Sequence, residues 1–378
     1  MKELRMVDLK GQYDRIKTEI DTAVQSVISS SVFISGPEVK SFEEELASYL
    51  GVKHVISCAN GTDALQVALM SLGLKPGDEV ITTNFTFIAS VEVIALLGLK
   101  PVFVEPEPDT FNISAEAIEK AIGPRTRAII PVHLFGQSAD LEEILKIARK
   151  HNLFIIEDVA QATGSEYIFS DGSRKKAGTM GDMGCTSFFP SKNLACFGDG
   201  GAIFTNDDSL AKLARSITNH GSTRKYYHDD IGVNSRLDAI QAAILRIKLR
   251  YLDEYNNARR NAASFYDRQL NRIEKVASPF RSNKSTHIFH QYTIKTDPGD
   301  RDNLKNYLEE RGIPSMIYYP VPMHRQKAYS FLRLGNDAFP VTSTLCNSVL
   351  SLPMHTELNI DQLKYICDNI YKFFEDNR

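Results

Sequence analysis

The sequence predicts an α/β protein with a mainly parallel β-sheet covered by helices on both faces, followed by a smaller C-terminal α+β domain. First, short apolar segments alternate with helical segments from residue 54 to residue 206. Second, these apolar segments are continuous, which is typical of parallel strands buried on both faces. Third, 378 residues exceed one average domain and predict two or three.

The first 50 residues precede this alternation and predict two helices. One amphipathic segment runs from about Tyr13 to Val27, and Ser35-Gly36-Pro37 interrupts the pattern. The second helix has apolar residues at spacings of three and four, which place one face toward a core: Val39, Phe42, Leu46 and Leu50.

Strands and helices then alternate. The expected strands are His54–Cys58, Val80–Thr83, Pro101–Val104, Arg127–Val132 and Leu153–Glu157. The expected helices are Thr62–Leu72, Thr86–Leu97, Ala115–Ile122 and Ala139–His151. Two further strands, Cys185–Phe189 and Ala202–Thr205, flank a lysine and a glycine-rich turn. Because ligands of such sheets bind beyond the carboxyl ends of the strands, functional residues are expected just after them.

A polar loop at 220–234 separates a short helix, Ser209–Thr218, from a long one. The long helix shows one apolar face, formed by Leu237, Ile240, Ile244, Ile247 and Tyr251. Ser235 and Asp238 have the spacing of a capping box at its start.

We expect the domain boundary near residue 246, in or just after the long helix. Residues 1–245 would form a large cofactor-binding domain and residues 246–378 a small C-terminal one. The small domain is expected to contain helices 253–271, 301–312 and 359–376, a strand near Gln291–Thr293 and the Pro-rich turn YYPVPMH at 318–324.

The composition is that of a globular protein without a nucleic-acid or membrane surface. Net charge is −3 and the basic residues are scattered. The N-terminal residues carry charges every few positions, unlike a signal peptide, and no apolar run approaches the roughly 18 residues of a membrane span. The five cysteines are widely spaced and contain no CxxC, so neither disulfides nor a metal site is indicated. We expect a cytoplasmic protein.

The chemistry is expected around Lys192, in the stretch CTSFFPSKNLACFGDGGAIFTN at 185–206. Burial among aromatic residues and glycines lowers the pKa of an amine, and a neutral amine can attack a carbonyl carbon. We therefore interpret Lys192 as the lysine that forms a Schiff base with pyridoxal phosphate. Taken alone, the stretch favours a surface lysine in a glycine-rich turn, so the interpretation depends on the other parts of a cofactor site.

A phosphate site is predicted in ISCANGTDALQVAL, where a strand ends at Cys58 and a helix follows. A helix N-terminus offers unpaired N–H groups to an anion. Gly61 would allow close approach of the backbone, and Thr62 would add a hydroxyl. The alternative is an Asn-Gly turn in which Thr62 is an ordinary N-cap.

The pyridine ring needs a carboxylate at its nitrogen and a cover on one face. Asp158 ends the apolar strand LFIIEDV, where a carboxylate is costly unless paired, and we assign it to the nitrogen. An N-cap aspartate is the alternative. Gln161, three residues on, is expected at the ring hydroxyl. Phe87, which follows the strand VITT, is expected against the ring face, with core packing as its alternative.

Signatures of other mechanisms are missing from the sequence. It contains no GxGxxG after the first strand, no GxxxxGK[ST], no HExxH and no GxSxG. The histidines are scattered without metal-ligand spacing, so no metal is expected.

The chain resembles the sugar aminotransferases of the DegT/DnrJ/EryC1/StrS family, a branch of the aspartate aminotransferase fold (fold type I). Five ordered motifs carry the resemblance: SCANGTDAL at 57–65, EDVAQ at 157–161, TSFFPSKNL at 186–194, GDGGAIFTND at 198–207 and GVNSRLDAIQAAIL at 232–245. Within this family, the residues of these motifs are most similar to those of enzymes that aminate C3 of a UDP-linked keto sugar, notably 3-oxo-N-acetylglucosaminuronate aminotransferases. The resemblance implies an aspartate aminotransferase-like large domain.

The resemblance agrees with the assignments above and adds residues to them. It implies Ser187 as a further phosphate ligand. It also implies a homodimer with shared active sites, in which Asn234 reaches the partner's cofactor phosphate and Arg236 the partner's substrate. Tyr318 and His324, from the Pro-rich turn, are further substrate-binding candidates. Members that dehydrate their sugar carry histidine in place of the lysine, so Lys192 argues against dehydration.

The function implied is transfer of the amine of L-glutamate to a nucleotide-linked keto sugar, at C3 of a UDP-sugar, during biosynthesis of lipopolysaccharide, another surface polysaccharide or a glycan precursor. One alternative is another lysine-type pyridoxal phosphate enzyme, such as a lyase or an amino-acid aminotransferase. The other is a catalytically silent cofactor-binding sensor. The sequence leaves the sugar, the nucleotide and the ring carbon open.

Overall fold

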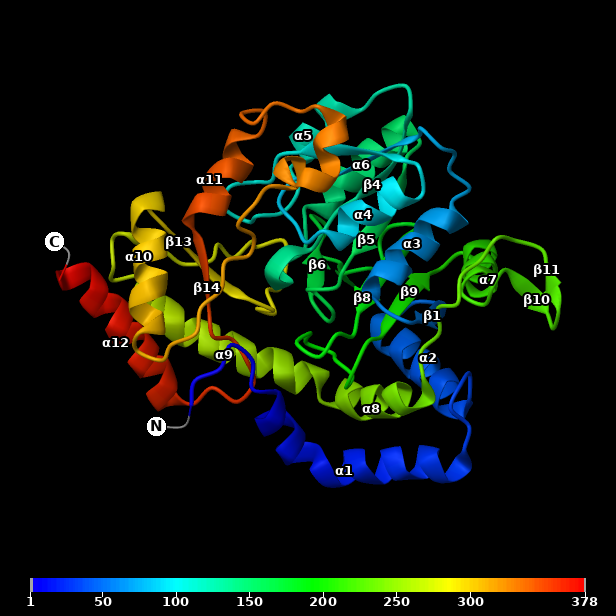
Figure 1. Ribbon diagram of the computed structural model, residues 1–378, viewed down its shortest axis with the longest axis horizontal. Helices are drawn as coiled ribbons and strands as arrows, with labels where there is room; N and C mark the ends of the chain where they lie inside the picture. Colours follow the sequence, from blue (N-terminus) through cyan, green and yellow to red (C-terminus); the bar gives the residue numbers. More distant parts are fainter. Residues whose placement is uncertain (1–2, 377–378) are drawn as a thin grey trace.

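The computed structural model describes residues 3–376. Its centre is a seven-stranded sheet with the order β1-β9-β8-β5-β4-β2-β3 (Figure 1). The strands are β1 His54–Cys58, β2 Glu79–Thr83, β3 Lys100–Val104, β4 Thr126–Ile130, β5 Phe154–Asp158, β8 Met183–Ser187 and β9 Gly201–Thr205. Neighbouring strands are parallel except that β9 runs antiparallel to both β1 and β8. The predicted fold class is confirmed, and the predicted strands are present with ends shifted by a few residues.

Both faces of the sheet are buried, which explains the continuous apolar strands. In β4, Ile129 packs in the core on one face, while Ala128 and Ile130 pack in the core on the other. Successive strand residues point to opposite faces, so a strand covered on both sides must be apolar at every position. Two helices cover the face on which Ile129 lies: α5 Ala115–Ala121 and α6 Leu141–His151.

The second face is covered by α3 Gly61–Ser71, α4 Ala89–Leu96 and α7 Asp208–Ile217. Near β1 and β9, the core is completed by α2 Pro37–Leu50 and α8 Ala239–Arg250. The long helix α1 Leu9–Ser30 lies along the outside of α8 at the bottom of Figure 1. All predicted helices of this half are present.

The predicted capping box at the start of α8 is wrong. Asp238 is the N-cap residue, but its side chain makes no capping hydrogen bond. The Ser235 hydroxyl instead accepts a hydrogen bond of 3.1 Å from the backbone N–H of Ala59, at the end of β1. The Ser235 hydroxyl, which the local spacing predicted to cap α8, is thus engaged by a residue distant in sequence.

The C-terminal part has its own apolar core around a three-stranded antiparallel sheet. Its elements are α9 Leu252–Leu270, β12 Val276–Ala277, β13 Tyr292–Thr296, α10 Pro298–Glu309, α11 Pro340–Ser348, β14 Val349–Leu352 and α12 Ile360–Asp376. Leu249 and Leu252 still pack in the core of α2 and α8. The division at residue 246 stays a prediction.

The remaining elements are short. They are the hairpins β6 Glu166–Ile168 with β7 Arg174–Lys176 and β10 Ser222–Arg224 with β11 Tyr227–His228, and the 3-10 turns η1 Leu134–Gly136, η2 Met323–Arg325 and η3 Lys327–Leu332. The β10–β11 hairpin projects from the right side of the molecule (Figure 1). Among residues 3–376, no helix combines the length and apolar character needed to cross a membrane.

Candidate active site

Several predicted residues meet at one edge of the sheet. Asp158 is the last residue of β5, Ser187 is the last residue of β8, and Gly61 follows β1 by three positions. These three strands point in the same direction, so their carboxyl ends lie at the same edge. Open α/β sheets bind their ligands at this edge, as expected from the sequence.

Lys192 lies in the loop that leaves β8 at this edge. Its backbone N–H donates to the carbonyl of Phe189 over 2.8 Å, which closes a turn, and its side chain is half-buried. Burial lowers the pKa of the Lys192 amine to about 8, and the nearby charge of Asp158 partly opposes this effect. A substantial fraction of the amine is therefore neutral near neutral or slightly alkaline pH, as a nucleophile or proton acceptor requires.

Asp158 is buried and held by two donors. The Ser90 hydroxyl donates to its Oδ2 over 2.7 Å, and the Ala160 N–H donates to its Oδ1 over 3.1 Å. Thr86 Oγ1 lies 3.3 Å from the Ser90 hydroxyl and extends the network. Two bonds leave acceptor capacity on the carboxylate, so Asp158 could also accept a hydrogen bond from a protonated ring nitrogen.

The start of α3 fits a phosphate. Asn60 is the N-cap, and its side chain accepts from the Asp63 N–H over 2.8 Å, so Thr62 is not the cap. A Cβ atom on Gly61 would come within 2.6 Å of the Ser187 Cβ, so only glycine allows this approach. The N-terminus of α3 and the Ser187 side chain are thus brought together, and a helix N-terminus beside a hydroxyl offers donors of the kind that a phosphate dianion needs.

Gly201 explains part of the glycine-rich turn. A Cβ atom there would come within 2.3 Å of the Asn60 carbonyl oxygen. The glycine therefore allows β9 to pass beside the start of α3. Its role is close backbone packing, whereas the helix end offers the anion site.

Two aromatic residues lie near Gln161: Tyr319, which contacts it, and Phe87, which lies beside Tyr319. The Phe87 side chain is 55% exposed, so its alternative as a core residue is wrong. The Phe87 ring centroid lies 6.3 Å from that of Tyr319. Gln161 accepts from the Phe135 N–H over 2.8 Å and donates to the Tyr319 hydroxyl over 2.9 Å. These bonds fix the orientation of the Gln161 amide. The exposed ring of Phe87 offers a surface against which a planar ring could pack.

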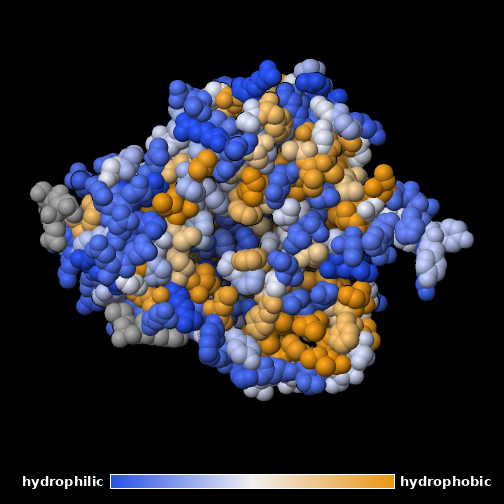
Figure 2. Space-filling view, viewed as in Figure 1, coloured by the Kyte–Doolittle hydropathy of each residue, from blue (hydrophilic) through white to orange (hydrophobic). Residues whose placement is uncertain are grey.

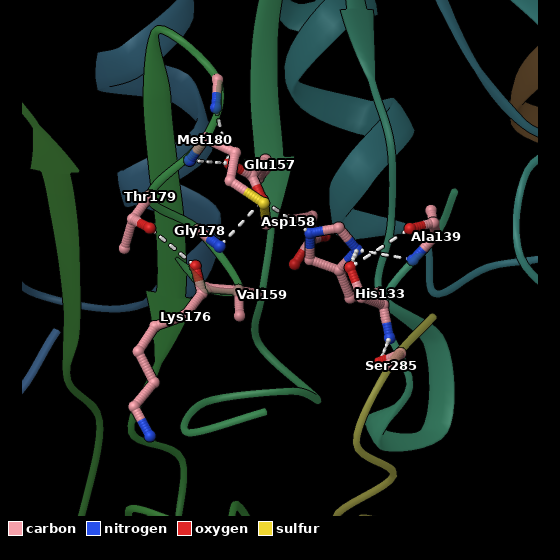
Figure 3. Close-up of polar contacts among 12 residues, drawn as sticks. His133, Ala139, Glu157, Asp158, Val159, Lys176, Gly178, Thr179, Met180 and Ser285 are labelled. Atoms are coloured by element: carbon pink, nitrogen blue, oxygen red, sulfur yellow. Dashed lines mark hydrogen bonds and ion pairs between the residues drawn. The ribbon is translucent and has the colours of Figure 1, made fainter. Parts of the chain in front are cut away.

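Behind Asp158, on the other side of β5, Glu157 and His133 form a fully buried pair (Figure 3). His133 Nδ1 accepts from the Ala139 N–H over 3.0 Å, so Nε2 carries the proton that is donated to Glu157 over 2.9 Å. Burial disfavours ionisation of Glu157, but these hydrogen bonds outweigh it and lower the pKa. The remaining donors to Glu157 are the N–H groups of Gly178, Met180 and Gly181. The pair fixes the strand end that carries Asp158.

Asn234, Arg236 and His324 do not join this group, whereas Tyr318 adjoins it through Tyr319. Asn234 is exposed on the segment after the β10–β11 hairpin. Arg236 lines a polar cavity of about 730 Å³ between α2, β1 and α7, and Lys192 and Asp158 do not line it. The Tyr318 ring lies beside that of Tyr319, with centroids 5.9 Å apart. The candidate active site is therefore identified from the side chains around Lys192 and Asp158, and the cavity lined by Arg236 lies elsewhere on the protein.

His324 does not stand free to contact a ligand. It is buried, and its Nδ1 lies 2.8 Å from the Asn84 side-chain nitrogen while its Nε2 lies 3.3 Å from the Asn336 carbonyl oxygen. Burial lowers its pKa. These contacts connect η2 with the end of β2, so the structure gives no support to His324 as a substrate ligand.

Two residues of the site were not predicted from the sequence. Ser90 lies on α4, where serine carries no distinguishing local signal. Tyr319 follows the predicted Tyr318, and only the course of the chain shows which of the two hydroxyls reaches Gln161. The tyrosine pair itself was the available signal, because it placed aromatic residues in the turn.

A half-buried lysine with a lowered pKa, the charge of a buried aspartate near its amine, and a helix end suited to a phosphate are the features expected of a pyridoxal phosphate-dependent enzyme on an α/β sheet. The chain belongs to the DegT/DnrJ/EryC1/StrS aminotransferase family, whose pattern matches residues 14–371. It is therefore a pyridoxal phosphate-dependent aminotransferase.

Similar proteins cover the chain almost completely. A "Pleiotropic regulatory protein" of Geobacillus stearothermophilus is 46% identical over 98% of both chains. The "UDP-2-acetamido-2-deoxy-3-oxo-D-glucuronate aminotransferase" of Pseudomonas aeruginosa is 44% identical over 96% of this chain and 98% of its own. The crystal structure of S. venezuelae DesV in complex with a ketimine intermediate is 39% identical, with a TM-score of 0.95 over 99% of both chains.

Proposed function

We propose that this aminotransferase moves the amine of L-glutamate to a nucleotide-linked keto sugar, at C3 of a UDP-sugar. The observation that carries the substrate class is the near full-length similarity to the Pseudomonas aeruginosa enzyme, whose name specifies a 3-oxo UDP-sugar. The product would enter a lipopolysaccharide, another surface polysaccharide or a related glycan precursor, made in the cytoplasm.

The residues of the site divide the work. Pyridoxal phosphate supplies an electrophilic carbon and a ring that accepts electrons. Lys192 would hold the cofactor in the resting enzyme and, once released, take a proton from the substrate carbon and return it. That task needs a neutral amine, in agreement with a pKa of about 8. Asp158 would keep the proton on the ring nitrogen. Phosphate contacts would come from Gly61, Thr62 and Ser187, and the ring contacts from Phe87 and Gln161.

The substrate proposal predicts a specific pattern of activity. Purified enzyme loaded with pyridoxal phosphate should convert glutamate to 2-oxoglutarate over many turnovers only when a keto sugar nucleotide is present to accept the amine. In a panel of UDP- and dTDP-linked keto sugars, UDP-3-keto sugars should have the highest kcat/KM, measured by mass spectrometry of the aminated product. Activity on free amino acids alone would reject the sugar assignment in favour of an amino-acid aminotransferase, and elimination without amine transfer would indicate a lyase.

A regulatory role is the second candidate, because the Geobacillus stearothermophilus relative carries a regulatory name. A silent sensor would bind the cofactor without reacting with an amine donor. The same preparations separate the two, since glutamate should bleach the visible absorbance of the bound cofactor in an aminotransferase. An unchanged spectrum, with intact cofactor binding, would support the sensor.

Shared active sites in a homodimer are part of the proposal. Asn234 is exposed, and Arg236 makes no hydrogen bond or ion pair with the rest of residues 3–376 while it lines a cavity apart from Lys192. The β10–β11 hairpin exposes Tyr226, and the segment after it exposes Ile231, the latter at 88%. We infer that Asn234 and Arg236 contribute to the site of a second chain, which a two-fold symmetric dimer permits.

An apolar surface supports the same pairing. The segment after α1 exposes Val32, Phe33 and Ile34. Figure 2 shows apolar residues gathered at the lower right, where Figure 1 places α1 and α8. Exposed apolar patches of this kind commonly mark protein interfaces, and we assign this one to a second copy of the chain.

Subunit complementation tests the shared sites. A hybrid dimer of one Lys192→Ala chain and one Asn234→Ala/Arg236→Ala chain should contain one intact site and one doubly defective site. Two different affinity tags allow its purification after co-expression, and its kcat should be about half of the wild-type value. Both parent homodimers, purified in the same way, should be far less active. A hybrid no more active than the parents would place all of these residues in one chain's site.

A further inference from the structure

A chain of buried side chains holds the residue that follows Lys192. Asn193 Nδ2 donates to Asn256 Oδ1 over 2.7 Å and lies 3.4 Å from the Ile288 carbonyl oxygen. Asn256 Nδ2 lies 3.4 Å from the Thr163 carbonyl oxygen. His290 Nδ1 lies 3.2 Å from Asn193 Oδ1. We call Asn193, Asn256 and His290 the polar chain.

The direction of every hydrogen bond in the polar chain is determined. The backbone carbonyls of Thr163 and Ile288 can only accept, so each must face an amide NH₂ group. Asn256 therefore presents its oxygen to Asn193, and Asn193 presents its own oxygen to His290. His290 must then carry its proton on Nδ1, and a lone pair remains on Nε2.

The polar chain connects four separate parts of the structure. Thr163 belongs to the turn after β5, which carries Asp158, and Asn256 lies on α9. His290 lies in the segment before β13. All three side chains of the polar chain are buried, so each hydrogen bond is made without competition from bulk water. The loop of Lys192 is thereby fastened to the C-terminal part of the protein.

The charges around the polar chain favour neutral groups. Burial above all, together with the charges of Lys192 and Arg259, lowers the pKa of His290 well below its ordinary value. Arg259 donates to the carbonyls of His290 and Met354, and its Nε is without a hydrogen-bond partner within residues 3–376. Asp158 is the charge that acts on Lys192. A neutral His290 adds no positive charge beside the lysine.

We propose that Asn193, Asn256 and His290 are positioning residues for Lys192. Through the backbone of Asn193 they hold the lysine loop between the β5 turn and α9, and so keep the Lys192 amine half-buried and aimed at the edge of the sheet. The proposal rests on the role of Lys192 given above, but its physical content concerns the loop and the environment of the amine. It can therefore be tested in the protein without cofactor.

The test measures the protonation of Lys192 directly. Cofactor-free protein is labelled with acetic anhydride between about pH 6 and pH 11, and the peptide that contains Lys192 is quantified by mass spectrometry. The wild-type midpoint is expected at about 8. In Asn193→Ala and Asn256→Ala, a loosened loop admits water to the amine, so the midpoint should rise by about one pH unit toward the ordinary lysine value.

Two variants of His290 test the donor. Asparagine can place an NH₂ group where His290 has Nδ1, whereas leucine cannot. His290→Asn should keep the wild-type midpoint, and His290→Leu should raise it. Circular dichroism and thermal unfolding of each variant show whether it is folded.

The controls lie in the same molecule. Lys248 is a second buried lysine with a pKa of about 8, set by burial, and its peptide should keep its midpoint in every variant. Asn369→Ala removes a buried amide of α12 that donates to the Tyr365 carbonyl, far from the lysine in the fold, and should not move the Lys192 midpoint. If Asn193→Ala and Asn256→Ala both fold and the pH dependence of Lys192 acetylation in both equals that of the wild type, the positioning proposal is wrong, even if Lys192 binds the cofactor.

Discussion

Lys192→Ala is expected to abolish amine transfer, with kcat lowered by about 10⁴-fold or more, at or beyond the upper range of a positioned acid–base group. Alanine can neither hold the cofactor nor move the substrate proton. Single-turnover mixing with glutamate, followed by absorbance of the cofactor and by release of 2-oxoglutarate, measures the loss. Borohydride reduction of the wild type should leave the cofactor on the peptide that contains Lys192.

Lys248→Met is the matched control for this variant. Lys248 is also buried and also has a lowered pKa of about 8, but it lies on α8 against the Phe197 ring. Methionine is unbranched and only one heavy atom shorter than lysine, so the variant should fold and retain activity. Full turnover by Lys192→Ala would show that the central assignment is wrong, and equal losses in both variants would show that buried lysines matter here only for stability.

Asp158→Asn is expected to lower kcat by about 100- to 1,000-fold, the size usual for removing a preorganised partner of developing charge. The amide keeps the shape of the side chain, but its single oxygen can accept from only one of Ser90 and Ala160, and it cannot hold a proton on the ring nitrogen. It should also lower the pKa of Lys192 below about 8, because the charge of Asp158 raises this pKa against the effect of burial. Acetylation of Lys192 as a function of pH measures this second effect.

Asp182→Asn controls for the loss of a carboxylate that contacts the same strand, β5, from the residue just before β8. Asp182 accepts from the Ile155 N–H over 2.7 Å, near the opposite end of β5. Its asparagine variant should keep both the turnover number and the Lys192 midpoint. An Asp158→Asn enzyme with wild-type turnover would contradict the role assigned to Asp158, whatever the control shows.

The sheet was predictable because its burial is recorded in every strand. A strand covered on both faces needs apolar residues at consecutive positions, and β4 and β5 show this directly in the sequence. Asp158 was singled out for the same reason, since a carboxylate at the end of such a strand is costly unless it is paired. Lys192 lies five positions beyond the end of β8 and was singled out only together with the other expected parts of a cofactor site. Local composition therefore pointed to the edge of the sheet.

Hydrogen bonds between distant segments were not predictable. Ser235 had the spacing of a helix cap, but its hydroxyl oxygen accepts a hydrogen bond from the Ala59 N–H, 176 positions away. His324 stood in a suggestive turn, but Asn84 and Asn336 take up its ring nitrogens. A hydroxyl, amide or imidazole accepts whichever partner the fold brings near, and sequence spacing does not contain that information.

The sequence by itself determined the α/β class, because burial on both faces of the sheet restricts the residue types in every strand. It also led us to propose Lys192, Asp158 and the start of α3 as parts of the cofactor site. Only the tertiary structure decided that Ser90 supports Asp158, that Tyr319 meets Gln161, and that Asn193 is held from α9. These contacts join segments far apart in the chain, and their energy depends on distances that exist only after folding.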